Sequence, residues 1–144
     1  MNPYLFWSCV AIATVTACAT ARADDANTIP ADQPTDVNGY EIACSGVGDE
    51  ARVDPRWPAF AVKVEFANRD AEYLSDIDVS VADSAGKALF HVRCETPWLL
   101  AKLPAGKYTV TGTYEGISKT AKLTAPAAGQ ARVVVRFPEI AGDQ

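Results

Sequence analysis

The sequence predicts an all-β protein, an antiparallel seven-stranded β-sandwich that follows an export signal. Within the 144 residues, apolar and polar side chains alternate over several short stretches, which is typical of strands with one buried face. Turn residues separate these stretches at intervals of roughly 8–12 residues, as in sandwiches and small barrels. No stretch long enough for a helix shows a 3.6-residue period. One sandwich of about 100 residues accounts for the patterned part of the chain.

The chain begins with a segment that differs from the rest. Residues 5–19 are apolar or small and uncharged, and Ala21-Arg22-Ala23 follows with the small-x-small pattern of a signal peptidase site. About 15 apolar residues are fewer than the roughly 20 that a membrane-spanning helix needs. We therefore predict a signal peptide over residues 1–23 and a periplasmic or secreted location.

A second processing route stays open. Val15-Thr16-Ala17-Cys18 resembles a bacterial lipobox, in which Cys18 would be lipidated and would anchor the protein to a membrane. Lipoprotein signals normally carry a basic residue near their start, and residues 1–4 contain none. Cleavage after Ala23 is the prediction, and an envelope lipoprotein anchored at Cys18 is the alternative.

Residues 24–38 form the next segment. They are polar, contain Pro30 and Pro34, and lack apolar periodicity, so they are expected to be a disordered leader. The sandwich domain is expected over residues 39–140.

Period-two alternation predicts the strands in order, and turn residues separate them. Gly46 and Gly48 end the first strand, and the charged, proline-containing residues 49–58 form a long loop. Further turns are expected at residues 83–86, 103–106 and 115–116, and residues 97–102 could form one helical turn. The expected strands are residues 40–44, 60–67, 76–81, 88–94, 108–114, 119–124 and 132–137.

Removal of the signal leaves two cysteines, Cys44 and Cys94. Two cysteines in an oxidising compartment usually pair, so we predict a disulfide between them. Two buried free thiols are the alternative.

Charge restricts the partners. Cleavage after Ala23 removes one of the 13 basic residues and none of the 18 acidic ones, so the mature chain is acidic. Nucleic acids and anionic lipids both require a basic face. We expect no nucleic-acid partner, and a membrane only if Cys18 is lipidated.

One motif resembles a known family. Residues 103–110, Leu-Pro-Ala-Gly-Lys-Tyr-Thr-Val, resemble the turn and strand of carboxypeptidase regulatory-like domains, and Gly129-Gln130 before residues 132–137 is similar to their closing strand. The resemblance covers roughly residues 60–137 and implies a transthyretin-like (prealbumin-like) sandwich, a scaffold with many functions. The turn itself suits Pro104 and Gly106, and Tyr108 can bury its ring while its hydroxyl reaches loop backbone.

Candidate catalytic chemistry is sparse in this sequence. His91 is the one histidine, and a nucleophilic triad needs such a base beside Ser or Cys. A metal site formed by Cys44, His91 and Cys94 is disfavoured, because residues three apart on a strand lie on opposite faces. We expect no enzyme activity, catalytic residue, metal or cofactor, with a metal-binding or hydrolytic site around His91 as the alternative. The remaining acidic candidates, Asp76, Asp78 and Asp83, lack the spacing of a calcium loop.

Two proline-flanked tryptophans, Trp57 and Trp98, are the candidate ligand contacts. Exposed indole rings would stack on a sugar or a peptide, whereas buried ones would cap the ends of the core. The sequence therefore predicts a non-enzymatic, exported module that binds a protein or glycan partner or supports structure in the cell envelope.

Overall fold

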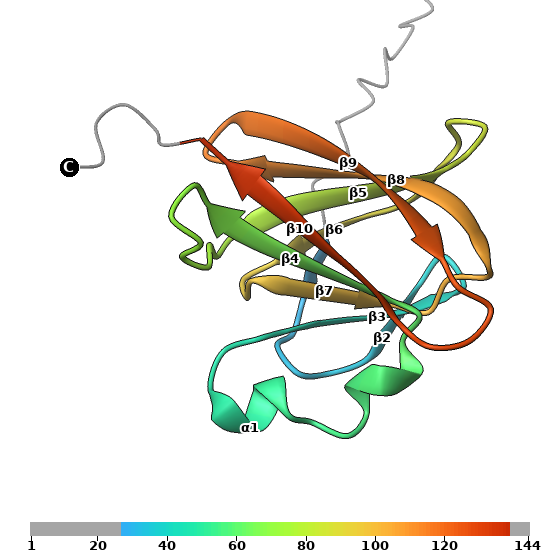
Figure 1. Cartoon of the computed structure of the whole chain (residues 1–144), viewed down its shortest axis with the longest axis horizontal. Helices are drawn as coiled ribbons and strands as arrows, with labels where there is room; N and C mark the ends of the chain where they lie inside the picture. The colour runs from blue at the N-terminus through green and yellow to red at the C-terminus, as the bar shows by residue number, and fades with distance from the viewer. Residues whose placement is uncertain (1–26, 139–144) are drawn as a thin grey trace, which may run out of the picture.

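The computed structural model describes residues 27–138, which form two five-stranded β-sheets packed face to face (Figure 1). Sheet A has the strand order β1-β6-β5-β8-β9, and sheet B has the order β10-β4-β7-β3-β2. A short helix, α1, and a 3₁₀ turn, η1, lie between β3 and β4. The elements are β1 (Asn27–Ile29), β2 (Thr35–Val37), β3 (Tyr40–Ser45), α1 (Asp49–Arg52), η1 (Trp57–Ala59), β4 (Val62–Asn68), β5 (Ile77–Asp83), β6 (Ala88–Cys94), β7 (Trp98–Ala101), β8 (Gly106–Tyr114), β9 (Ile117–Ala125) and β10 (Ala131–Phe137).

The all-β prediction is confirmed, but the seven-stranded antiparallel prediction is wrong. The described residues contain ten strands, and both sheets are mixed, because β1 runs parallel to β6 and β10 runs parallel to β4. The strand count and these parallel pairs also depart from the transthyretin-like arrangement that the sequence resemblance implies. Strands β1, β2 and β7 have three, three and four residues, too few for alternation to reveal them.

The first two strands fall in the segment that was expected to be a disordered leader. Ile29 is buried in the core, and β1 pairs with β6 from Asn27 opposite Val92 to Ile29 opposite Cys94. The amide of Asp32 also donates a hydrogen bond to the carbonyl of Cys44 at 2.8 Å. The leader prediction is therefore wrong for residues 27–38, because Ile29 is buried in the core and Val37 packs against it in an otherwise mostly polar stretch. Residues 24–26 lie outside the described part.

Strand β7 lies in the middle of sheet B, between β3 and β4, where the sequence suggested one helical turn. All four of its residues are buried. Leu99 joins the central core and Leu100 packs on the outer side of the sheet. A continuous apolar run is what a strand covered on both faces requires, and four residues are too short to distinguish it from a turn of helix.

The central core lies between the sheets, and the predicted disulfide between Cys44 and Cys94 crosses it. Cys44 belongs to β3 of sheet B and Cys94 to β6 of sheet A, and neither is exposed. The bond therefore joins the two sheets covalently, and the alternative of two free thiols is excluded.

The turn before β8 has the expected geometry. Tyr108 is buried, and its hydroxyl donates a hydrogen bond to the carbonyl oxygen of Pro104 at 2.7 Å. Burial, and to a lesser extent the nearby carboxylate of Asp83, raises the pKa of Tyr108 above its ordinary value.

Replacing Tyr108 by Phe is expected to reduce the free energy of unfolding by about 1 kcal/mol at pH 7, because the Pro104 carbonyl loses its donor. The raised pKa adds a pH dependence. The stabilisation is complete below the unfolded tyrosine pKa of about 10 and is lost as pH rises through the higher folded pKa. Urea unfolding from pH 7 to 11 should therefore show the two proteins converging at high pH, and a constant difference would contradict the assignment.

Candidate functional site

The outer face of sheet B carries a second hydrophobic cluster. Residues 46–60, here called the cover segment, contain α1 and η1 and lie against this face, below the sheets in Figure 1. The indole N–H of Trp57 donates a hydrogen bond to the carbonyl of Ala51 at 2.7 Å and so ties η1 to α1. The cluster consists of Ala43, Trp57, Phe60, Trp98 and Leu100.

Gly46 begins the cover segment and packs on the ring of Trp98. A Cβ at this position would lie 2.7 Å from Cγ of Trp98, closer than real Cβ contacts. The backbone φ of Gly46 is also +107°, which side-chain-bearing residues rarely adopt. Glycine is therefore required at position 46 for both reasons.

The cover segment is held at its other end by Gln130, from the loop between β9 and β10. Its side-chain amide donates hydrogen bonds to the carbonyls of Trp57 and Phe60, at 2.8 Å and 3.0 Å. These carbonyls lie at the start of η1 and just after its end, so one side chain links η1 to the far end of the chain.

The two tryptophans proposed as ligand contacts are brought together, but not as exposed platforms. Trp57 is 3% exposed and Trp98 is 6% exposed. The stacking hypothesis is therefore wrong for both rings, and the alternative, in which both belong to a core, describes them. Both rings belong to the second hydrophobic cluster on the outer face of sheet B, and they do not cap the ends of the central core.

Beside Trp98, cations and aromatic rings alternate. The ammonium of Lys63 lies over the Trp98 ring, 4.3 Å from its centroid, and the rings of Trp98 and Tyr73 meet edge to face, with centroids 6.5 Å apart. The guanidinium of Arg52 lies over Tyr73 at 5.3 Å, within range for a cation–π interaction. A cleft of about 200 Å³ opens here. It is lined by Arg52, Val53, Asp54, Pro55, Trp57, Pro58, Lys63, Trp98 and Gln130.

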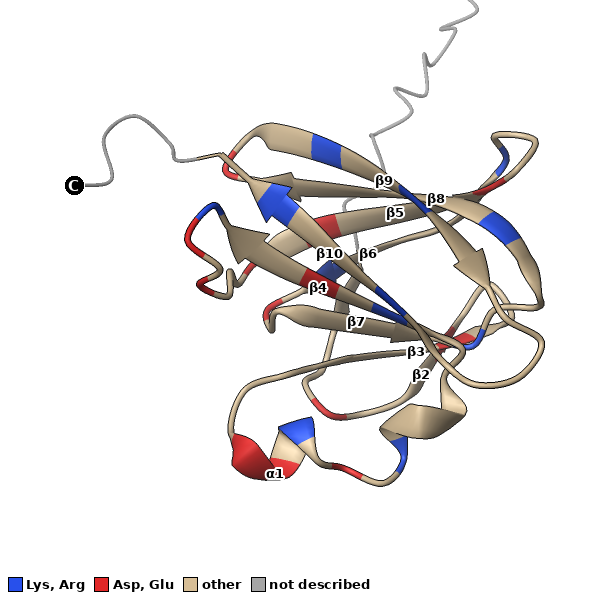
Figure 2. Ribbon diagram, viewed as in Figure 1, with Lys and Arg blue, Asp and Glu red and all other residues tan. Residues whose placement is uncertain are grey.

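A buried carboxylate lies on the same face, two residues beyond Lys63 on β4. The side chain of Glu65 is only 2% exposed, accepts a hydrogen bond from the Tyr73 hydroxyl at 2.9 Å, and forms an ion pair with Arg132 of β10. Figure 2 shows that β4 carries an acidic segment and that the neighbouring strand β10 carries basic segments. The hydrogen bond from Arg132 to Glu65 raises the pKa of Arg132. The pair fixes Tyr73 beside Trp98.

Apolar exposure is concentrated around the cover segment. Among residues 27–138, the large hydrophobic side chains exposed to solvent are Val47 at 62%, Val53 at 78% and Tyr73 at 41%. Val47 and Val53 flank α1, and Tyr73 contacts Arg52 at the end of α1. Apolar side chains that gather at one place on a surface mark interaction sites more often than scattered ones do. We call these three residues the apolar rim.

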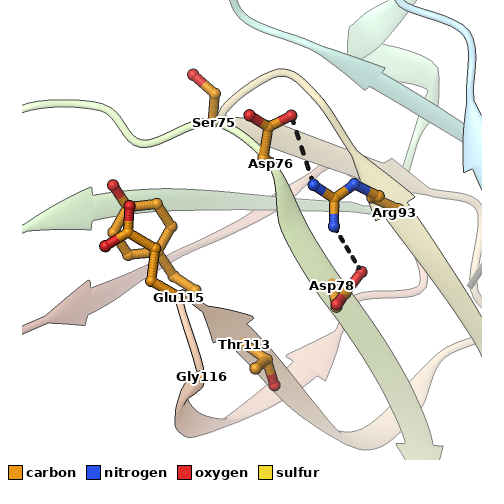
Figure 3. A pocket seen from close by; sticks show the side chains of 8 residues that line it. Ser75, Asp76, Asp78, Arg93, Thr113, Glu115 and Gly116 are labelled. Carbon is orange, nitrogen blue, oxygen red and sulfur yellow. Dashed lines mark hydrogen bonds and ion pairs between the residues drawn. The ribbon is translucent and has the colours of Figure 1, made fainter.

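A larger cleft, of about 500 Å³, lies at one end of sheet A (Figure 3). Its one cation, Arg93, points between Asp76 and Asp78, with N–O distances of 3.9 Å and 3.5 Å. Partly exposed pairs of this kind contribute little free energy. Because the cation already has two carboxylate partners, this cleft is a weaker candidate for an anionic ligand than the one beside Trp98. The third aspartate of the calcium hypothesis, Asp83, accepts backbone hydrogen bonds within its turn.

The metal-ligand set around His91 does not assemble. His91 is exposed on the outer face of β6, whereas Cys94 lies in the core, joined to Cys44. Both thiols are consumed by the disulfide, so the set of Cys44, His91 and Cys94 cannot ligate a metal. No cluster of three or more His, Cys, Asp or Glu side chains suited to a metal occurs within residues 27–138.

Comparison with known proteins finds no matching family model and no matching curated protein. The resemblance to carboxypeptidase regulatory-like domains therefore stays a prediction. In the described part of the chain, no helix has the length and apolar character to cross a membrane. The expected signal peptide and Cys18 lie outside the described residues.

Sequence reasoning missed Lys63, Glu65, Tyr73, Gln130 and Arg132. Period-two alternation over residues 60–67 places Lys63 and Glu65 on the face opposite Val62 and Val64, which predicts exposure to solvent. The run Trp98-Leu99-Leu100-Ala101 carries the signal that could have found them, since such a strand needs a cover on both faces. A segment that covers the outer face of β7 also lies near the outer face of the neighbouring strand β4, which carries Lys63 and Glu65.

Proposed function

We propose that this chain is an exported, non-enzymatic β-sandwich module that binds a partner protein in the cell envelope through the apolar rim. The observation that carries this proposal is the gathering of Val47, Val53 and Tyr73 around α1. One of the three, Tyr73, packs against Trp98 of the second hydrophobic cluster. A protein is favoured over a glycan because neither indole ring offers a free face for sugar stacking.

Site-specific photo-crosslinking tests the binding surface. A photoreactive phenylalanine analogue replaces Val53 in the rim, and a matched variant carries it at Ala85, in the exposed turn between β5 and β6. In cells of the native host, we expect a discrete protein adduct from position 53 and none from position 85. Identical adduct patterns from both positions, or none from either, would refute the assignment of the rim.

The inter-sheet disulfide supports export, because such bonds persist in oxidising compartments. Intact mass of the protein from its native host tests this part of the proposal. A mass that begins at Asp24 and lacks two hydrogens supports a soluble periplasmic or secreted module. A lipid-sized excess on a chain that begins at Cys18 supports the anchored alternative, and a full-length chain with reduced thiols contradicts export.

A further inference from the structure

Strand β10 is an edge of sheet B (Figure 1). Within residues 27–138, it pairs with β4 and with no other strand. The amide of Ala131 donates a hydrogen bond to the carbonyl of Ala61, so the odd-numbered residues of β10 form the parallel ladder with β4. The N–H and C=O groups of the even-numbered residues therefore point away from β4, toward the free edge. These residues are Arg132, Val134 and Arg136.

The other three edges of the two sheets are protected against the addition of a strand, as exposed edges usually are. Strands β1 and β2 have three residues each. Strand β9 has nine residues, but alternation places the charged side chain of Lys119 on the same face as Leu123 of the core. A charge on the inward face of an edge strand disfavours pairing with another strand. Strand β10 has no such charge, because its inward face carries Ala131, Val133, Val135 and Phe137.

The strands on this side of the sandwich carry positive charge alone. Residues 117–137 contain four basic residues and no acidic one, although the whole chain has a net charge of −5. Figure 2 shows the basic segments along β9 and β10. Arg132 is paired with Glu65. Within the described residues, no carboxylate forms an ion pair with Lys119, Lys122 or Arg136. Three cations beside the free edge are therefore available to another molecule.

We propose that an extended, acidic segment of the partner protein adds to sheet B as a further strand beside β10. Its backbone pairs with the free N–H and C=O groups of β10, the mode of recognition called β-augmentation. Acidic side chains on the outer face of the added strand lie opposite Arg136, because opposite charges on facing strands attract. The backbone hydrogen bonds supply affinity, and the basic residues of β9 and β10 supply the preference for acidic sequence.

A second copy of this chain is a poorer occupant of the edge than an acidic segment. Two β10 strands that pair antiparallel with full overlap place Arg132 of each strand opposite Arg136 of the other. Like charges that lie directly opposite each other on paired strands are destabilising. The two arginines therefore oppose self-pairing and favour an acidic strand, which is how charge discriminates between partners.

The inference rests on the proposed function, because the added strand belongs to the partner that binds the apolar rim. Contacts across the outer face of sheet B connect the two surfaces. Arg132 of β10 forms an ion pair with Glu65, and Glu65 accepts a hydrogen bond from the hydroxyl of Tyr73 in the rim. One partner can therefore cover both the rim and the edge.

Hydrogen exchange measured by NMR on the full-length ¹⁵N-labelled protein tests the pairing. The probes are three capped peptides of the length of β10, in which Val alternates with Glu, Gln or Lys. We expect the Glu peptide to slow exchange at the amides of Arg132, Val134 and Arg136. Exchange at Val133 and Val135 should not change, because these amides already bond to β4. The Gln peptide should bind several-fold more weakly, and the Lys peptide should not bind.

Two variants and a control separate backbone pairing from charge. Val134→Pro removes an N–H at the free edge and no bond to β4, an orientation in which edge strands tolerate proline, so the fold should persist and binding of the Glu peptide should be lost. Arg136→Gln keeps the backbone intact and should weaken binding roughly threefold, the scale of an exposed ion pair. Lys107→Gln, on the outer face of sheet A, should leave binding unchanged.

Three results would overturn the inference. Unchanged exchange at the free-edge amides with every peptide, while crosslinking at Val53 persists, leaves the rim as a binding surface without a strand site. Equal effects of the Glu and Lys peptides show that charge is not recognised. Slower exchange at these amides as protein concentration rises, with no peptide present, shows that a second copy occupies the edge. Protection by the Glu peptide without crosslinking at Val53 supports the strand site and refutes the rim.

Discussion

Reduction of the disulfide between Cys44 and Cys94 is expected to lower the free energy of unfolding by about 4 kcal/mol. The bond closes a loop with a sequence separation of 50 residues, so it removes much of the conformational entropy of the unfolded chain. It also joins β3 to β6, which belong to different sheets. A loss of this size is a large fraction of the stability of an ordinary domain.

Urea unfolding with and without reductant, followed by tryptophan fluorescence, measures this loss. The matched control is the double variant Cys44→Ala/Cys94→Ala, which should unfold at a lower urea concentration and be insensitive to reductant. A wild-type midpoint that is unchanged after reduction in denaturant and refolding would show that the bond contributes no stability.

Gly46→Ala is expected to destabilise the protein by about 3 kcal/mol, through two effects that act at one residue. The added Cβ would overlap the Trp98 ring, at 2.7 Å from Cγ, and alanine disfavours a φ of +107°. The variant should also change the environment of Trp98, because the ring or the cover segment must move. Urea unfolding gives the stability, and the emission maximum of the folded state reports on Trp98.

Gly48→Ala separates the two effects. Gly48 has a φ of +88°, but nothing lies within 4 Å of a Cβ built there. The cost should therefore be only that of the backbone conformation, about 2 kcal/mol because a ψ of 154° with this φ is nearly confined to glycine, with unchanged fluorescence. Equal losses in the two variants would show that the close contact between Gly46 and Trp98 carries no energetic weight.

The parts of the fold that the sequence predicts correctly depend on local signals. Period-two alternation identifies the long strands, such as β8, whose Tyr108 and Val110 are buried as expected. Glu115-Gly116 forms the tight turn between β8 and β9, with positive φ at both residues. The disulfide is predicted because only Cys44 and Cys94 remain after removal of the signal, and two cysteines in an oxidising compartment usually pair. Each of these signals lies within a few neighbouring residues or follows from the number of cysteines in the mature chain.

The parts that the sequence does not predict depend on tertiary placement. Ile29 and Val37 are isolated apolar residues in a mostly polar stretch, and β1 is a strand because it pairs with β6. The parallel pairing of β10 with β4 joins distant segments and has no local signature. The sequence does not predict the candidate site for the same reason. Lys63, Tyr73 and Trp98 come from three separate segments, and Lys63 meets Trp98 because β4 pairs with β7 in sheet B.

The inter-sheet disulfide also determines how this domain responds to mechanical tension. A pull on the N-terminal end loads β1 along its length, in shear against the parallel strand β6. Once β1 and β2 have detached, force reaches Cys44 and passes through the sulfur atoms to Cys94, bypassing β4 and β5. The 50-residue separation between the cysteines withholds about 170 Å of contour length from extension, at 3.3–3.6 Å per residue. Much of the β-sandwich, including the cover segment, therefore remains outside the path of the load.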